Sequence, residues 1–224
     1  MAAGRGSRMM PLTNHIPKAM AQFRNTTLIA NSIEKIKNHS LNIHITVGYK
    51  GADLAKHVIE QGVSSILNTE GKGNAWWIFN TLMKLIDEPV LVLTCDNITE
   101  LNIKQLYTDY SDKGSPACMV IPVKPVAGLE GDYIFHENYV VKELNRHKIS
   151  EAYCSGIQIL NPIKINNLMD PCDDFYTLWR KLIANNDLYC SNIYPEKWFA
   201  VDTIDQLMVA NKDSILPGKF PLQK

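Results

Sequence analysis

The first 18 residues hold the densest group of side chains and backbone positions suited to binding an anion. Residues 3–18 read Ala-Gly-Arg-Gly-Ser-Arg-Met-Met-Pro-Leu-Thr-Asn-His-Ile-Pro-Lys, and no acidic residue precedes Glu34. Gly4 and Gly6 can adopt backbone conformations closed to other residues, so successive N–H groups can face an anion at close range. Three side chains add positive charge: Arg5, Arg8 and Lys18. The segment is therefore predicted to bind a polyphosphate.

The pattern continues beyond the glycines. Gly4-Arg5-Gly6-Ser7-Arg8 is followed at fixed spacing by Pro11, Thr13, Pro17 and Lys18. The prolines stiffen the loop by fixing φ, so Lys18 is expected to return to the phosphates that the glycine turn holds. From Ala2 to Lys18 the pattern resembles the signature of the sugar-phosphate nucleotidyltransferase family, and the resemblance covers essentially the whole chain.

The resemblance implies transfer of a nucleotidyl group from a nucleoside triphosphate to a small phosphorylated acceptor, with Mg²⁺ and release of pyrophosphate. Lys18 is then expected at the α-phosphate and the acceptor phosphate, and Arg8 at the β- and γ-phosphates. The expected nucleotide contacts are Ala2, Ala3, Gly4, Arg5, Gly6, Ser7, Asn68, Gly71, Gly73 and Asn74. The alternative for Asn74 is a helix N-cap. CTP and UTP are the leading donors.

Two carboxylates are predicted to hold the metal. Asp96 follows the apolar run 90–94, at the carboxyl end of a predicted strand, where α/β proteins bind ligands. In the resembled family an Asp at this place and an Asp like Asp202 bind the metal. Thr94 and Ala200 stand where relatives often carry further acids, so Asp96 and Asp202 must act as a pair. The structural alternative for each is to cap the following helix.

The acceptor is expected to contact the middle of the chain. Family resemblance assigns this site to four residues: Glu143, Arg146, Ser155 and Gly156. The match around Glu143 is poor, whereas Thr94-Cys95-Asp96-Asn97 resembles phosphocholine-type cytidylyltransferases. Sugar 1-phosphate, polyol phosphate and phosphocholine therefore all remain candidate acceptors. Clustered aromatic side chains could bind the quaternary ammonium group of phosphocholine. Of the neighbours Trp76 and Trp77, one is expected in the core.

Two classes of rival function can be weighed. A non-catalytic nucleotide-binding regulatory domain is favoured slightly by Ala200 and opposed by the intact Lys18, Arg8 and Asp96. A P-loop kinase would need Gly-Lys-Ser/Thr after the loop, and a dehydrogenase would need a third glycine. The sequence completes neither of the last two patterns.

Strand–helix alternation predicts a doubly wound, Rossmann-like α/β fold with a mixed, mostly parallel sheet flanked by helices. A small β-hairpin insertion is expected on the acceptor side. Helices are predicted at 28–36, 53–61, 74–86, 101–112, 163–169, 175–185 and 203–212. Strands are predicted at 43–47, 64–67, 90–94, 117–123, 153–160 and 188–194, with the hairpin at 132–135 and 139–144. The apolar run 90–94 suits a strand buried on both faces of a parallel sheet.

Residues 1–215 are predicted to form one nucleotidyltransferase domain, followed by an irregular tail at 216–224. In phosphate-binding α/β proteins the glycine loop follows a strand. No such strand precedes Gly4, so we expect one to lie upstream of the first residue.

Composition restricts the partners. The chain has 224 residues, 46% of them hydrophobic, and 23 basic residues balance 23 acidic ones. A neutral chain without a long basic run argues against nucleic acid as a partner, and no apolar run reaches the roughly 20 residues that span a bilayer. Five scattered cysteines favour reduced thiols and a cytoplasmic location. The sequence is compatible with a homo-oligomer.

Overall fold

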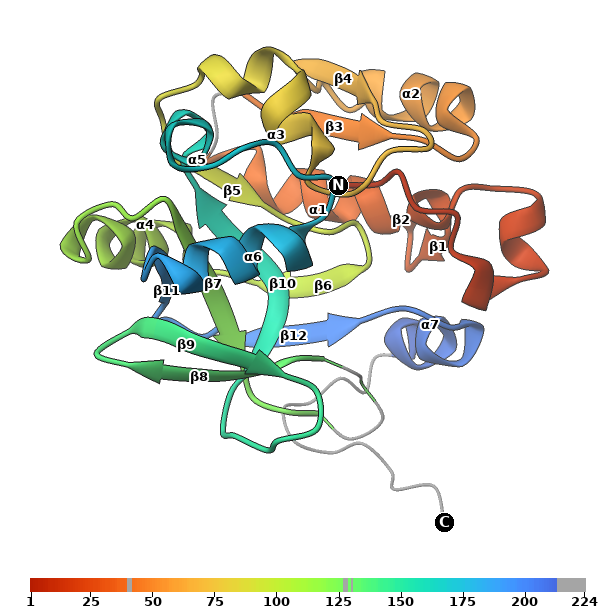
Figure 1. Cartoon of the computed structure of the whole chain (residues 1–224). Helices are drawn as coiled ribbons and strands as arrows, with labels where there is room; N and C mark the ends of the chain where they lie inside the picture. Colours follow the sequence, from red (N-terminus) through yellow and green to blue (C-terminus); the bar gives the residue numbers. More distant parts are fainter. Residues whose placement is uncertain (40–41, 127–128, 130, 213–224) are drawn as a thin grey trace. The chain divides into compact units, whose positions relative to one another are not determined.

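The computed structural model describes residues 1–39, 42–126, 129 and 131–212 (Figure 1). The chain forms two compact units. The first unit contains Met1–Gly71, Thr94–Glu100 and the segment that begins at Lys197. The second contains Lys72–Leu93 and Leu101–Glu196. The predicted tail at 216–224 lies outside the described residues.

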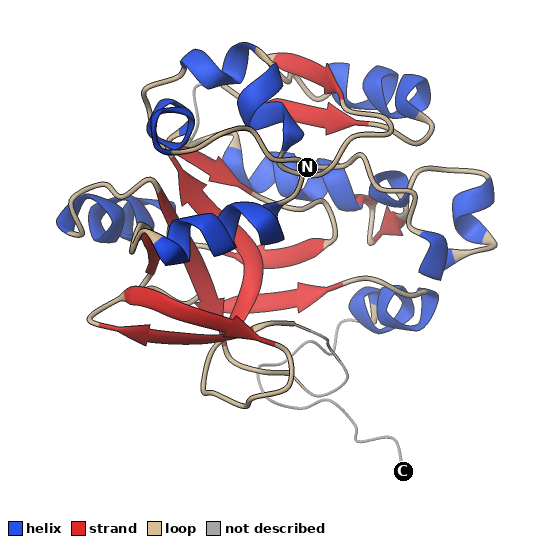
Figure 2. Cartoon of the chain, viewed as in Figure 1, coloured by secondary structure: helices blue, strands red, loops and turns tan. Residues whose placement is uncertain are grey.

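The first unit combines short sheets with helices (Figure 2). Its N-terminal segment forms the 3₁₀ turns η1 (Ser7–Met9), η2 (Leu12–Asn14) and η3 (Lys18–Met20). Next come β1 (Gln22–Phe23), β2 (Thr26–Thr27), α1 (Leu28–Ile36), β3 (His44–Val47), α2 (Gly51–Ile59) and β4 (Ser65–Asn68). The later segments supply β6 (Asn97–Glu100), β12 (Lys197–Ala200) and α7 (Ile204–Asn211). Strands β3 and β4 pair in parallel, whereas β1–β2 and β6–β12 are antiparallel.

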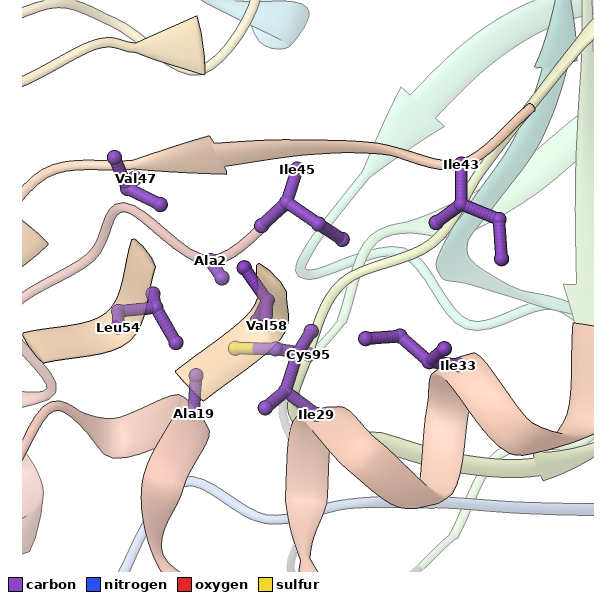
Figure 3. Packing of buried hydrophobic residues seen from close by; sticks show 10 residues of the cluster. All are labelled: Ala2, Ala19, Ile29, Ile33, Ile43, Ile45, Val47, Leu54, Val58 and Cys95. Atoms are coloured by element: carbon purple, nitrogen blue, oxygen red, sulfur yellow. The ribbon is translucent and has the colours of Figure 1, made fainter. Parts of the chain in front are cut away.

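The core of the first unit anchors the N-terminal segment (Figure 3). Ala2 and Ala19 are buried in one cluster with residues of α1, β3 and α2, together with Cys95. The Ala2 N–H donates to the Thr46 carbonyl over 3.1 Å, and the Cys95 N–H donates to the Met1 carbonyl over 3.0 Å. Residues 1–3 are thus held between β3 and the segment that precedes β6.

The second unit is built on a six-stranded sheet in the order β5–β10–β7–β11–β9–β8. These strands are β5 (Val90–Val92), β7 (Cys118–Val123), β8 (Tyr133–Glu137), β9 (Val140–Asn145), β10 (Tyr153–Leu160) and β11 (Leu188–Cys190). Its helices are α3 (Trp76–Asn80), the 3₁₀ turn η4 (Leu82–Leu85), α4 (Ile103–Asp112), α5 (Pro162–Leu168) and α6 (Phe175–Ala184). The β7–β11 pair is parallel, and the pairings of β10 with β5, β7 and β8 are antiparallel.

The mixed α/β class, the hairpin β8–β9 and most predicted helices are confirmed. The single helix predicted at 74–86 is wrong, because the chain breaks at Thr81, which has extended backbone angles. The Thr81 hydroxyl donates to the Trp77 carbonyl and accepts from the Met83 N–H. This side chain therefore competes with the helical pattern and starts a separate turn, as threonine does at helix ends.

The strand predicted at 90–94 is shorter and differently placed. β5 pairs antiparallel with β10, and of its three residues only Val92 is buried. The expectation of a strand buried on both faces of a parallel sheet is therefore wrong. The predicted strand 188–194 likewise stops at Cys190, and the sequence did not predict β6 or β12.

Among the described residues, no helix has the length and apolar character that crossing a membrane would need. All five cysteines are free thiols, and three of them are buried.

Candidate active site

Lys18 lies between two carboxylates in the first unit. Its ammonium Nζ is 2.6 Å from Asp96 Oδ2 and 2.8 Å from Asp202 Oδ1. The Lys18 side chain is only 9% exposed, whereas those of Asp96 and Asp202 are 25% and 27% exposed. A buried cation is thus enclosed by two anions that still reach solvent. The structure brings together three of the residues that the sequence singled out.

The antiparallel β6–β12 ladder explains why the two carboxylates meet. Asp96 directly precedes β6 and Asp202 lies two residues beyond β12. The ladder pairs Ala200 with Asn97, and the Val201 N–H donates to the Asp96 carbonyl over 3.0 Å. Both carboxylates therefore emerge at the same end of this ladder.

Lys18, at the start of η3, reaches the two carboxylates from the N-terminal segment. Its neighbour Ala19 is buried in the core, and Pro17 in an extended conformation leads into the turn η3. The backbone of Lys18 is therefore fixed by packing, and only its side chain extends to the carboxylates.

Neither carboxylate caps the helix that follows it. α7 is capped by Thr203, whose hydroxyl accepts from the Gln206 N–H while the Gln206 side chain accepts from the Thr203 N–H. α4 is capped by Asn102. The capping alternative is therefore wrong for both Asp96 and Asp202.

The ion cluster shifts the protonation equilibria of its members. Burial by itself would lower the pKa of Lys18, but the charges and hydrogen bonds of Asp96 and Asp202 outweigh it, and this pKa is raised. Burial would raise the pKa of Asp96, but the Lys18 ammonium and a hydrogen bond from Thr94 hold it below the ordinary value. Both groups are therefore charged at neutral pH.

The donor set suits Mg²⁺. This ion is commonly bound by one or two carboxylates, with water and substrate phosphates completing an octahedron, and Asp96 and Asp202 offer such a pair. A structural zinc site would need four protein ligands. Within residues 1–39, 42–126, 129 and 131–212, no group of three or more His, Cys, Asp or Glu residues is suited to a metal.

The N-terminal segment 3–13, here called the glycine loop, lies against this cluster. Gly6 has φ of 67°, and a Cβ at this position would stand 2.7 Å from the Lys18 Cβ. A side chain at Gly6 would therefore displace Lys18. A Cβ at Gly4, by contrast, would meet no atom within 4 Å. Arg8 is mostly exposed, and its guanidinium lies 3.0 Å from Asp202 Oδ1.

The other predicted nucleotide contacts are divided between the two units. Ala3, Arg5 and Ser7 belong to the N-terminal segment of the first unit, and Asn68 and Gly71 lie at the end of its stretch Met1–Gly71. The Asn68 side chain accepts from the Glu70 N–H over 3.0 Å and so shapes its own turn.

Gly73 and Asn74 belong to the second unit, where they contact the segment before α6. A Cβ at Gly73 would stand 2.1 Å from the Asp173 carbonyl oxygen. The Asn74 side chain accepts from the Phe175 N–H over 2.8 Å, and α3 has Ala75 at its N-cap position. The alternative that Asn74 caps its own helix is therefore wrong, and its side-chain oxygen is engaged with α6.

The predicted acceptor residues lie on β9, beyond its end, and on β10 in the second unit. Arg146 pairs with Asp132 over 3.0 Å, and Glu143 accepts from Asn145 over 2.8 Å. The Ser155 hydroxyl donates to the Ile121 carbonyl and accepts from the Ile157 N–H, across the bulge that contains Gly156. Glu143 and Ser155 are thus engaged with neighbours in the sheet, whereas Arg146 pairs with Asp132 just outside the strands.

The aromatic side chains divide between core and surface. Trp77 is 4% exposed, which confirms that one member of the Trp76–Trp77 pair packs in the core. Lys72 lies over the ring of Trp76. Tyr133 and Tyr153 contact each other, with ring centroids 4.4 Å apart.

The sequence missed one residue that contacts the glycine loop. The Tyr49 hydroxyl donates to the Thr13 carbonyl over 2.9 Å, and the Thr13 hydroxyl donates to the Gly6 carbonyl over 3.0 Å. The local signal that could have indicated it is an aromatic residue within Gly48-Tyr49-Lys50-Gly51, the stretch that follows β3.

Curated sequence relatives match most of this chain. A mannose-1-phosphate guanylyltransferase catalytic subunit beta of Drosophila melanogaster is 22% identical over 206 residues, covering 86% of this chain and 56% of that protein. A mannose-1-phosphate guanyltransferase of Pichia angusta is 26% identical over 218 residues, covering 90% of this chain and 59% of the relative. The chain thus spans less than two thirds of the length of these curated relatives.

Solved structures support the same fold. The CTP:phosphocholine cytidylyltransferase of Streptococcus pneumoniae has a TM-score of 0.70 at 20% identity, covering 94% of this chain and 95% of that one. The inositol-1-phosphate CTP transferase of T. maritima has a TM-score of 0.75 at 15% identity, covering 96% of this chain and 95% of that one.

The family model described as nucleotidyl transferase matches residues 1–213. This match confirms the resemblance inferred from the segment Ala2–Lys18. The chain belongs to the nucleotidyl transferase family.

Proposed function

We propose that this protein is a Mg²⁺-dependent nucleotidyltransferase that transfers a nucleoside monophosphate from a nucleoside triphosphate to a sugar 1-phosphate or a related small phosphorylated acceptor. The observation that carries the proposal is the buried Lys18 ammonium between Asp96 and Asp202, directly against the glycine loop. A cation and two hard carboxylates beside a glycine-containing loop suit the handling of a triphosphate.

In the proposed reaction an oxygen of the acceptor's phosphate attacks the α-phosphorus of the triphosphate. A bond forms between these two atoms, and the bond from the α-phosphorus to the oxygen bridging to the β-phosphate breaks. Pyrophosphate leaves with that oxygen and its negative charge. No protein nucleophile is needed, so catalysis consists of positioning and charge stabilisation.

The chain's own groups would divide this work. Lys18 would stabilise charge at the α-phosphate, and Arg8 would contact the β- and γ-phosphates with the two parallel hydrogen bonds that guanidinium offers phosphate. Asp96 and Asp202 would hold Mg²⁺, which when bound neutralises phosphate charge. The N–H groups of residues 4–7 would face the triphosphate.

The choice of donor and acceptor has two sources of support. The pattern Thr94-Cys95-Asp96-Asn97 favours CTP or UTP, and with it a polyol phosphate or phosphocholine as an alternative acceptor. The sequence relatives are described as mannose-1-phosphate guanylyltransferases, so GTP and mannose 1-phosphate belong among the substrates to be tested.

Pyrophosphate release tests the proposal. The protein, with Mg²⁺, is given each nucleoside triphosphate against sugar 1-phosphates, polyol phosphates and phosphocholine. Release with one pair identifies both substrates. Nucleotide binding without release for any pair would favour the non-catalytic regulatory alternative and contradict the proposed reaction.

The two loop glycines are expected to respond differently to alanine. Gly4→Ala leaves the fold unchanged, because its Cβ meets no atom within 4 Å, but weakens triphosphate binding by about tenfold or more, since the methyl group occupies space beside the loop N–H groups. Gly6→Ala lowers the free energy of unfolding by about 1–2 kcal/mol because of its left-handed backbone. Thermal unfolding and calorimetric titration with nucleotide measure the two effects. Wild-type nucleotide affinity in Gly4→Ala would place the triphosphate elsewhere.

A further inference from the structure

Tyr49 contacts both ends of the glycine loop. It lies between β3 and α2, where its N–H donates to the Ala3 carbonyl over 3.1 Å. Its hydroxyl donates to the Thr13 carbonyl over 2.9 Å. One residue outside the loop thus connects the start of the loop with its far side.

The contact with Thr13 continues to the lysine. Thr13 is 1% exposed, and its hydroxyl donates to the Gly6 carbonyl, which also accepts from the Met9 N–H. Gly6 in turn packs directly on the aliphatic part of Lys18. A continuous path of hydrogen bonds and close packing therefore runs from the Tyr49 hydroxyl to the Lys18 side chain.

Two cationic side chains also lie over the ring of Tyr49. The Arg5 guanidinium carbon lies 5.3 Å from the ring centroid, and the Lys50 ammonium lies 5.8 Å from it. Cations at such distances are attracted to the face of an aromatic ring. Arg5 is exposed, so this contact restrains a side chain that would otherwise sample many rotamers.

We propose that Tyr49 is a positioning residue that orders the glycine loop before nucleotide binds. This inference rests on the proposed function, since it assumes that the loop binds a triphosphate. A loop that is already ordered avoids the entropic cost of being fixed on binding, and a protein whose competent state is only partly populated binds in proportion more weakly. Tyr49 itself would touch no reacting atom.

Tyr49→Phe tests the proposal with the smallest change. It removes the hydroxyl donor and keeps the ring that faces Arg5. Tyr110→Phe is the matched control, because the Tyr110 hydroxyl also donates to a main-chain carbonyl, that of Pro116, over 2.8 Å, and it is buried in the second unit. Thr13→Val removes the next hydrogen bond on the same path.

Two readouts are needed. Hydrogen exchange of residues 6–13, measured without ligand, reports whether the loop loses order. Calorimetric titration with each Mg²⁺–nucleoside triphosphate, together with KM and kcat for the active pair, reports whether that order matters. A role limited to stability would change the melting temperature without changing the KM for nucleotide.

Tyr49→Phe is expected to speed exchange in the loop and to weaken triphosphate binding by about 3- to 10-fold, the range that one hydrogen bond supports. The KM for nucleotide should rise by the same factor, with kcat and the KM for the acceptor unchanged. Tyr49→Phe combined with Thr13→Val should be no worse than the stronger single variant, since both act on one path. Tyr110→Phe should lower the melting temperature and leave the nucleotide affinity unchanged.

Unchanged nucleotide affinity in Tyr49→Phe, or an equal loss in Tyr110→Phe, would overturn the inference. If the wild-type protein binds nucleotide but releases no pyrophosphate, the proposed reaction fails, and the nucleotide affinity of Tyr49→Phe still tests whether Tyr49 orders the loop. If the wild-type protein binds no nucleoside triphosphate, both proposals fail.

Discussion

Asp96→Asn is expected to lower the rate of nucleotidyl transfer by about 10³-fold or more while the protein stays folded. Asparagine keeps the size of the side chain but removes the negative charge that would help to hold Mg²⁺. Asp202 then remains as the one carboxylate of the pair. Among the described residues no third metal-binding side chain joins Asp96 and Asp202 in a group, so none can replace Asp96. Steady-state pyrophosphate release at saturating substrates measures the effect, and circular dichroism checks the fold.

Asp53→Asn provides the matched control. Asp53 is exposed in the first turn of α2, so this change removes the same charge without touching the ion cluster. We expect wild-type activity in the control. An Asp96→Asn protein that turns over at a rate close to wild type would refute the assignment of this carboxylate to the metal.

Lys18→Met is expected to lower activity by about 10²–10³-fold, the cost of removing one preorganised charge-stabilising group. It also changes the resting protein. Asp96 and Asp202 both lie within 2.8 Å of the same ammonium, and without it two partly buried carboxylates repel each other. We expect the free energy of unfolding to fall by about 1–3 kcal/mol, less than for a fully buried pair because both carboxylates reach solvent.

The pH dependence follows from the lowered pKa of Asp96. In the wild type this carboxylate stabilises the fold at every pH above its ordinary pKa, and the contribution is lost only in acid as the pH falls through the lowered value. In Lys18→Met the main cause of the lowering is absent. The difference in stability between the two proteins should therefore be largest at neutral pH and shrink on acidification, as measured by urea unfolding.

Mg²⁺ should partly replace the missing ammonium. We expect Mg²⁺ to raise the melting temperature of Lys18→Met more than that of the wild type, in which the cation competes with Lys18 for the carboxylates. Lys56→Met, on the exposed side of α2, serves as the control and should behave as wild type. An equal effect of Mg²⁺ on all three proteins would contradict a shared cation site at Asp96 and Asp202.

Most helices and the hairpin were predictable because their patterns are local. The apolar face of α1 repeats over nine residues, and its bounds agree with the prediction. The break at Thr81 was not predictable, because one side-chain hydroxyl that bonds two backbone groups ended a pattern that otherwise suits a longer helix. The strands β6 and β12 have four residues each, which is too short for a clear periodicity.

By itself the sequence singled out Lys18, Asp96 and Asp202, the residues proposed to carry the chemistry. The glycines, prolines and basic side chains of the N-terminal loop affect the backbone conformation and charge of their near neighbours in sequence. Their expected role can therefore be inferred from the local pattern, and the resemblance to the family followed from that pattern. Only the tertiary structure decided that Asp96 and Asp202, 78 and 184 residues along the chain from Lys18, meet at one ammonium. It also decided that Thr203 and Asn102 cap the helices α7 and α4, and that the Tyr49 hydroxyl donates to the Thr13 carbonyl. The physical reason is that ladder pairing, core packing and long-range hydrogen bonds depend on segments that are distant in sequence, and no local pattern records which of them will meet.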